Sequence, residues 1–157
     1  SDDVVGVQLG GAIKNVYAIS SGIVKGLQYG ENASAALLTR AIAEMVKICI
    51  SFGGKKESIF GLSGVGDILL TCTSESSRNF ILGKALGEGE ELKNIISNKH
   101  TIAEGYFTAK AIYNLVKSKN IDTPILNAIY DILYNKSQPK DKAESLLNRP
   151  LKDKEFC

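Results

Sequence analysis

The sequence predicts an all-α domain that carries one short strand at its N-terminus. Segment 33–52 is the clearest evidence, because apolar residues recur in it every three or four positions and so fall on one face of a helix. The same spacing returns along most of the chain, whereas a run typical of a strand occurs at 4–9. No internal repeat and no low-complexity linker divides the sequence.

The expected strand, Val-Val-Gly-Val-Gln-Leu, leads into a helix whose apolar stripe runs to Gly26, which ends it. Small residues at the start of this helix, Gly10, Gly11 and Ala12, would let another backbone come close.

The helix over 33–52 has recognisable ends. Asn32 can act as its N-cap, and the glycines at 53 and 54 stop it. Arg40 and Glu44 stand four residues apart, so we expect them to form an ion pair on its surface.

Shorter helices account for the rest of the chain. The glycine-rich segment 61–66 is expected to be a loop that opens a short helix through 68–71. Another helix should run from near Ser77 to near Gly87, and segment 101–105 should be extended. The remaining expected helices are 91–96, 106–119, 126–134 and 142–147.

The composition bounds what the chain can be. With 157 residues, of which 44% are hydrophobic and 23% charged, it fits one domain with a core of its own. The net charge is only +2 and the lysines are scattered, which argues against nucleic acid or an anionic membrane as partner. Cys49, Cys72 and Cys157 form no Cys-x-x-Cys pair, which favours a reducing cytoplasm. One histidine and three scattered cysteines offer no usual metal site.

The start of the chain is unusual, since Ser1 is no initiator and the expected strand has nothing before it. We therefore expect that a region N-terminal to it has been removed. No Gly-x-Gly-x-x-Gly follows a strand, so we expect no dinucleotide cradle within these residues.

Lys14 and Asp67 are the first candidates for chemistry. Lys14 stands near the small-residue start of an otherwise apolar helix. If that end faces a cleft, partial desolvation favours the neutral amine, and such a lysine can pass a proton near neutral pH. Asp67 follows Gly64-x-Gly66 and could orient Lys14 by a hydrogen bond. The alternatives are a solvated surface lysine and an aspartate that is favoured by the dipole at a helix start.

The segment Ser77-Arg78-Asn79 is the second candidate. A serine cap leaves free N–H groups and the positive end of the helix dipole in the first turn, which together attract an anion. Arg78 adds a guanidinium that matches phosphate with two hydrogen bonds, and Asn79 could donate to a sugar-like hydroxyl. The alternative is an ordinary capped helix with an exposed arginine. Taken alone, His100 and Glu104 are weaker candidates.

Taken in order, several motifs resemble those of one family. They are GVQLGGAIKNV at 6–16, NASAALLTR at 32–40, GLSGVGD at 61–67, SRN at 77–79, Glu104-Gly105, Pro124-Ile125 and LLNR at 146–149. On these motifs the chain resembles, over nearly its whole length, the C-terminal domain of bacterial NAD(P)-dependent glycerol-3-phosphate dehydrogenase.

The resemblance implies a helical fold of the 6-phosphogluconate dehydrogenase C-terminal type. It also implies interconversion of dihydroxyacetone phosphate and sn-glycerol 3-phosphate with NAD or NADP, which feeds phospholipid synthesis in the cytoplasm. Lys14 is then the proton donor or acceptor, and no metal ligand is implied. The implied substrate-binding positions are Lys14, Asp67, Ser77, Arg78 and Asn79. The implied cofactor-binding positions are Arg78, Ile102 and Glu104.

The family's N-terminal dinucleotide-binding half is missing from the sequence. We therefore expect residues 1–157 to be a single helical substrate-binding domain that is inactive alone. Its expected partner is the small-molecule substrate, without nucleic acid or membrane, and a homodimer is left open.

Two other interpretations stay open. One is a non-catalytic helical dimerisation module, against which Lys14, Asp67 and Arg78 argue, because a packing module has no use for three such residues around one cleft. The other is a sister dehydrogenase of the same two-domain plan that acts on another hydroxy acid or sugar. The Ser-Arg-Asn segment favours a phosphorylated substrate over that alternative.

Overall fold

Helices make up most of the residues that this computed structural model describes, which are 2–98 and 102–150. In chain order the elements are α1 (Val4–Gly26), α2 (Gly30–Ser51), α3 (Lys56–Phe60), the π-helical turn η1 (Leu62–Gly66), α4 (Asp67–Thr73), α5 (Arg78–Gly87), α6 (Leu92–Ser97), α7 (Glu104–Ser118), α8 (Pro124–Tyr134) and α9 (Pro139–Leu147). No strand occurs in the described ranges, so the all-α prediction is confirmed for them.

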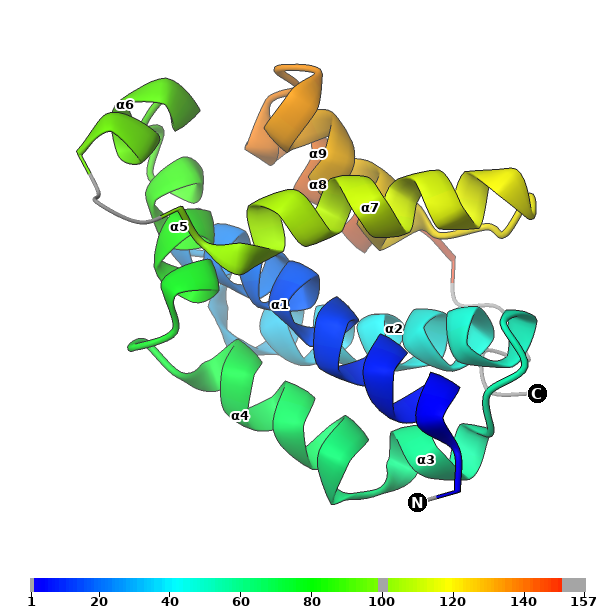
Figure 1. Ribbon diagram of the computed structural model, residues 1–157. Coiled ribbons are helices and arrows are strands. Elements are labelled where there is room, and N and C mark those ends of the chain that lie inside the picture. The colour runs from blue at the N-terminus through cyan, green and yellow to red at the C-terminus, as the bar shows by residue number, and fades with distance from the viewer. Residues whose placement is uncertain (1, 99–101, 151–157) are drawn as a thin grey trace.

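Helix α1 runs through the middle of the domain, and most of the other helices pack around it, whereas α6 packs against α5 (Figure 1). In the view of Figure 1, α7, α8 and α9 lie above α1, whereas α3 and α4 lie below it. The second half of α1 is buried almost all round, and Val16, Tyr17 and Ile19 are fully covered. A helix in such a position needs apolar residues on every face, which is what this stretch of the sequence has.

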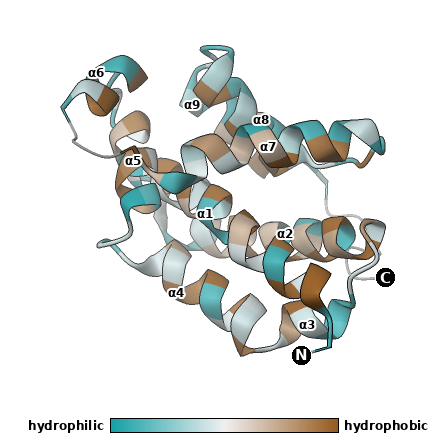
Figure 2. Ribbon diagram, in the orientation of Figure 1, coloured by the Kyte–Doolittle hydropathy of each residue, from teal (hydrophilic) through white to brown (hydrophobic). Residues whose placement is uncertain are grey.

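The strand predicted at 4–9 was wrong, because these residues form the first turns of α1. Asp3 caps this helix by accepting a hydrogen bond of 2.9 Å from the backbone N–H of Gly6. A lone strand would leave its backbone groups without partners in the described part of the chain, whereas a helix satisfies them locally. That gain outweighs the weak helix propensity of valine. Val4 is 61% exposed, and Figure 2 shows this apolar first turn at the N-terminal end of α1.

Glycines of α1 and α5 bring the backbones of these two helices together. Gly22 and Gly26 on α1 face Gly83 and Gly87 on α5, four residues apart in both helices. A Cβ atom added at Gly83 would lie only 2.0 Å from the carbonyl oxygen of Ile19, and one at Gly22 only 2.1 Å from that of Phe80. The two backbones therefore touch, and no other residue type fits at these positions without movement.

The close approach predicted at the start of α1 is absent. A Cβ atom at Gly11 would meet nothing within 4 Å, and one at Gly10 would make only ordinary contacts, the nearest at 3.6 Å. The glycines of α1 that touch the backbone of α5 thus lie about three turns after Gly10 and Gly11.

Most predicted helices are present, with ends that shift by a few residues. Helix α2 begins at Gly30 rather than at 33, so Asn32 lies inside its first turn and is not its N-cap. Within segment 61–66, residues 62–66 form a π-helical turn rather than an open loop, and this turn continues directly into α4. Of the segment predicted as extended, 102–103 is non-helical but Glu104 and Gly105 already belong to α7, while Thr101 lies outside the described residues.

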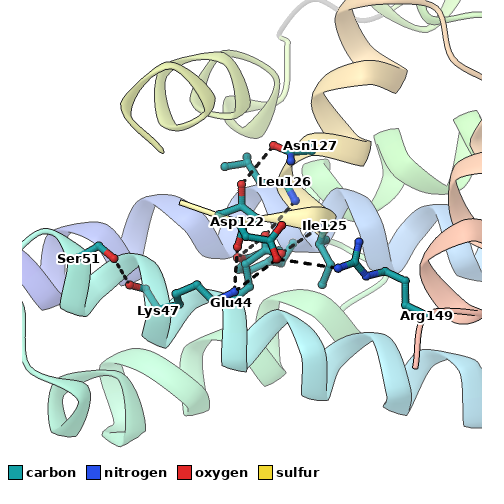
Figure 3. A network of polar contacts seen from close by, with 10 residues as sticks. Glu44, Lys47, Ser51, Asp122, Ile125, Leu126, Asn127 and Arg149 are labelled. Atoms are coloured by element: carbon teal, nitrogen blue, oxygen red, sulfur yellow. Dashed lines mark hydrogen bonds and ion pairs between the residues drawn. The ribbon is translucent and has the colours of Figure 1, made fainter. Parts of the chain in front are cut away.

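Buried polar contacts fix α8 to α2. The carboxylate of Glu44 on α2 accepts hydrogen bonds of 2.9 Å from the backbone N–H groups of both Ile125 and Leu126, in the first turn of α8 (Figure 3). Its Oε1 also accepts a hydrogen bond from the hydroxyl of Tyr17 on α1. The ion pair predicted between Arg40 and Glu44 was wrong, since Arg40 turns away and donates to carbonyl groups at the end of α9 and beyond it.

A second part of the same network lies at the surface. Lys47 donates to the backbone carbonyl of Asp122 at 2.9 Å, and Arg149 approaches the carboxylate of Asp122 at 3.9 Å (Figure 3). These contacts connect α2 with the loop before α8 and with the residues after α9. Among the described helices, none is both long and apolar enough to pass through a membrane.

Candidate functional site

Lys14 and Asp67 meet across two helices, although 53 residues separate them in the sequence. Lys14 lies on α1, and its Nζ donates to Oδ2 of Asp67, the first residue of α4, at 2.6 Å. The predicted hydrogen bond is therefore present. The two side chains are 25% and 38% exposed, so the pair faces solvent and is within reach of a small molecule.

The turn before α4 explains how Asp67 reaches this position. Helix α3 and η1 fold back against α1, with Ile59 fully buried beneath them and Gly64 buried in η1. Helix α4 then begins at Asp67 and buries Ile68 and Cys72 on its inner side. A carboxylate in the first turn of a helix is also favoured by the helix dipole. The aspartate thus serves both the helix start and the lysine.

The start of α5 forms the second part of the candidate site. A serine caps this helix, as predicted, and it is Ser77, whose Oγ accepts a hydrogen bond of 3.4 Å from the backbone N–H of Phe80. Arg78 is the first residue of the helix and is exposed. The first turn therefore presents backbone N–H groups, the positive end of the dipole and a guanidinium in one place, which is a favourable arrangement for an anion.

Asn79 differs from its neighbours because its side chain turns inwards. Only 7% of it is exposed, its Nδ2 donates to Oδ1 of Asn15 at 3.2 Å, and its Oδ1 accepts from the backbone N–H of Gly105 at 2.7 Å. These two bonds use one amide hydrogen of Asn79 and leave the other for a ligand. A role of Asn79 in substrate binding therefore stays a prediction. The sequence analysis gave Asn15 no role of its own, and its position directly after Lys14 is the one sequence signal that could have indicated a place in the site.

Ile102 and Glu104 lie at the start of α7. Ile102 is 37% exposed, and Glu104 is the first residue of the helix and also exposed. Since Gly105 bonds to Asn79, the start of α7 lies beside the start of α5. The structure therefore joins Lys14 to Asp67 directly, and it connects the starts of α5 and α7 with α1 through the hydrogen bonds of Asn79.

The remaining candidates have ordinary roles or fall outside the described residues. Cys49 and Cys72 are buried free thiols, and burial raises the pKa of Cys72 to about 11. His100 and Cys157 lie outside the described residues. Within residues 2–98 and 102–150, no three or more His, Cys, Asp or Glu side chains gather as metal ligands would.

Fold and site together define an all-helical domain with a lysine–carboxylate pair beside an anion-attracting helix start. The family described as NAD-dependent glycerol-3-phosphate dehydrogenase C-terminus matches residues 3–144. The chain therefore belongs to this family.

Relatives of known name agree with this assignment. A protein of Staphylococcus aureus strain USA300 / TCH1516 named glycerol-3-phosphate dehydrogenase [NAD(P)+] is 45% identical over 152 residues, which are 97% of this chain and 46% of that protein. The chain thus spans about half the length of the relatives that it matches.

Solved structures show the same fold. The crystal structure of glycerol-3-phosphate dehydrogenase from Coxiella burnetii matches with a TM-score of 0.92 and 40% identity, over 95% of this chain and 46% of that one. A glycerol-3-phosphate dehydrogenase of Plasmodium falciparum matches with a TM-score of 0.81 but only 19% identity, over 98% of this chain and 45% of that one, and supports the fold alone.

Proposed function

We propose that this chain is the substrate-binding and catalytic half of a glycerol-3-phosphate dehydrogenase that interconverts dihydroxyacetone phosphate and sn-glycerol 3-phosphate. The single observation that carries this proposal is the 2.6 Å hydrogen bond between Lys14 and Asp67, in a chain of this family. It holds the amine of Lys14 in one orientation and partly open to solvent, and the neighbouring Asn15 is bonded to Asn79 in the first turn of α5, a helix start that suits phosphate.

Lys14 is proposed to handle the proton of the reaction. Reduction of the carbonyl carbon creates negative charge on the oxygen, and an ammonium group beside that oxygen stabilises the charge and then donates a proton to it. In the reverse direction the neutral amine of Lys14 accepts the proton from the hydroxyl group. In both directions of the reaction, the hydrogen bond to Asp67 keeps Nζ of Lys14 in the same orientation.

Arg78 and the start of α5 are proposed to hold the phosphate. The guanidinium offers two parallel hydrogen bonds, and the first turn that Ser77 caps adds backbone N–H groups and the helix dipole. A phosphate fixed there would place the carbonyl of the substrate near Lys14, which lowers the entropy cost of reaching the reactive geometry. Asn79 could add one hydrogen bond through its remaining amide hydrogen.

Arg78, Ile102 and Glu104 are proposed to contact one edge of a dinucleotide. Arg78 suits a phosphate group, and Ile102 and Glu104 offer an exposed apolar contact and a carboxylate at the neighbouring start of α7. When bound, NAD or NADP supplies or accepts the hydride. The described elements include no strand and therefore no strand–glycine turn–helix cradle, so we propose that a separate N-terminal half binds most of the cofactor. Residues 1–157 are then one substrate-binding domain and inactive alone.

Exposed leucines near the site support a second half. Leu62 in η1 is 92% exposed, and Leu69 and Leu70 on α4 are 43% and 69% exposed, all within five residues of Asp67. Apolar residues grouped in this way are typical of a surface that another domain covers. A domain seated there would also shield the Lys14–Asp67 pair from water.

The proposal also covers the compartment, the partners and the oligomeric state of the enzyme. We place it in the cytoplasm, where the buried free thiols of Cys49 and Cys72 stay reduced and where glycerol 3-phosphate feeds phospholipid synthesis. Its partner is the phosphorylated substrate, with no nucleic acid or membrane, which suits a net charge of only +2. A homodimer is also part of the proposal, and sedimentation of the whole gene product measures it.

Oxidation of NADH and NADPH in the presence of dihydroxyacetone phosphate tests the proposed reaction. The whole gene product that contains this chain should be active with at least one cofactor, and residues 1–157 alone should be silent. A whole gene product that is silent with both cofactors contradicts the proposal. Activity with another hydroxy acid or sugar in place of dihydroxyacetone phosphate would instead favour a sister dehydrogenase.

A further inference from the structure

Three helices of the candidate site are joined by one buried polar bridge. Asn79 donates from Nδ2 to Oδ1 of Asn15 at 3.2 Å and accepts at Oδ1 from the backbone N–H of Gly105 at 2.7 Å. Asn15 belongs to α1, Asn79 to α5 and Gly105 to α7. The bridge therefore connects segments that lie 64 and 26 residues apart in the sequence.

Each member of the bridge directly follows a residue of the proposed site. Asn15 comes after Lys14, Asn79 comes after Arg78, and Gly105 comes after Glu104. Because neighbouring residues on a helix are rigidly connected, a shift of one bridge residue moves the adjacent functional side chain. The bridge thus sets the spacing of the proposed proton donor, the phosphate-binding arginine and the start of α7.

The bridge is tightly enclosed. Asn15 and Asn79 are 9% and 7% exposed, and Gly105 is buried. A Cβ atom at Gly105 would lie 2.6 Å from Oδ1 of Asn79 and 2.7 Å from the backbone oxygen of Asn15. Buried amides need partners, and their directed bonds accept only a narrow range of geometry. Small displacements between the three helices are therefore resisted.

The crossing of α1 and α5 has a second contact besides this bridge. Helices α1 and α5 already touch backbone to backbone at Gly22 and Gly83, seven residues after Asn15 on α1. That contact holds the helices together, whereas the asparagines lie two turns away, next to Lys14 and Arg78. An apolar pair would fill the same place without fixing a direction, so the polar pair points to a need for exact spacing.

We propose that Asn15 is a positioning residue, which acts through Asn79 to fix Lys14 and Arg78 relative to each other. The inference rests on the proposed function, because it concerns the spacing of that reaction's two groups. A misplacement of about 1 Å can lower a rate about 100-fold when two groups must reach one substrate together. Loss of Asn15 should therefore affect both kcat and KM, since it displaces the proton donor and the phosphate site at once.

The test compares Asn15→Leu, Asn15→Asp and Asn79→Ala in the whole gene product, with dihydroxyacetone phosphate as the substrate. Asn15→Leu keeps the volume but removes the acceptor, and it should lower kcat/KM about 100-fold through both constants. Asn15→Asp keeps an oxygen that accepts from Asn79, and it should recover most of the activity. In the Asn79→Ala background, Asn15→Leu should cause little further loss, because the two act as one unit.

A matched control and the contrary results complete the test. Ser20→Ala removes another buried hydrogen bond of α1, from Ser20 Oγ to the carbonyl of Tyr17, and should leave kcat/KM unchanged. If Asn15→Leu matches the wild type, or if its loss adds in full to that of Asn79→Ala, the positioning role is wrong. If Asn15→Leu fails to fold, an Asn15→Asp variant that folds without recovering activity overturns it equally. A silent wild-type protein, in contrast, marks the failure of the proposed function itself.

Discussion

Glu44 should make the stability of this domain depend on pH. Its carboxylate is 4% exposed and accepts three hydrogen bonds, from the Tyr17 hydroxyl and from two backbone N–H groups of α8. Burial raises the pKa of Glu44 from its ordinary value of 4.5 to about 7, against the opposing effect of the hydrogen bonds and the charge of Lys47. In the unfolded chain the carboxyl group is hydrated and regains its ordinary value.

Because the pKa of Glu44 is higher in the folded chain than in the unfolded chain, a low pH favours the folded state. Between pH 4.5 and about 7 the folded chain holds a proton that the unfolded chain has released. The stabilisation is therefore fully present below pH 4.5 and is lost as the pH rises through about 7. At about 1.4 kcal/mol for each pKa unit, the difference amounts to roughly 3 kcal/mol in the free energy of unfolding.

Glu44→Gln isolates this contribution, because the amide fills the same space and does not titrate. Urea unfolding of both proteins at pH 4.5, 6, 7 and 8 gives the difference in free energy of unfolding at each pH. The wild type should lose roughly 3 kcal/mol relative to the variant across this range. Glu31→Gln, an exposed change on the same helix, should give no comparable trend. A difference between wild type and Glu44→Gln that is constant with pH would refute the reasoning.

Three further predictions concern packing, capping and the phosphate site. Gly83→Ala would place a Cβ atom 2.0 Å from a backbone carbonyl of α1, so urea unfolding should show that the free energy of unfolding falls by roughly 3 kcal/mol. Gly11→Ala, whose Cβ atom meets nothing within 4 Å, should leave that free energy unchanged or raise it. Equal effects of the two substitutions would contradict the packing described for α1 and α5. Asp3→Ala should lower the Tm more at pH 7 than at pH 3. Two backbone N–H groups hold the pKa of Asp3 below its usual value, so the stability that Asp3 contributes is lost as the pH falls through that lowered pKa. An equal drop in Tm at both pH values would count against this role of Asp3. Arg78→Ala in the whole gene product should mainly raise the KM for dihydroxyacetone phosphate, and an unchanged KM would argue against the phosphate site.

The long helices could be predicted from the sequence because their periodicity is a local property. The segments expected at 106–119 and 126–134 correspond to Glu104–Ser118 and Pro124–Tyr134. The first turns of α1 could not be predicted in this way, since a short run of valines suits either a strand or a helix. The absence of a partner strand in the described structure and the cap by Asp3 decide between the two.

The Lys14–Asp67 contact was expected from the residue types and from the resemblance, and the structure contains it. The direction of other polar side chains depends on which helices cross, which no local pattern reveals. Glu44 turns towards α8 instead of pairing with Arg40. Asn79 likewise turns towards Asn15 instead of lying open beside Arg78. In both cases the side chain bonds to a buried polar group of a distant segment, because that buried group would otherwise lack a hydrogen-bond partner.

Replacement of Lys14 tests the central proposal most directly. In the whole gene product, Lys14→Ala should lower kcat for the reduction of dihydroxyacetone phosphate about a thousandfold or more, with a smaller change in KM, because the ammonium group acts mainly in the transition state. Lys25→Ala, an exposed lysine near the end of the same helix, should leave kcat unchanged. A Lys14→Ala protein that is folded and turns over at close to the wild-type rate would contradict the account.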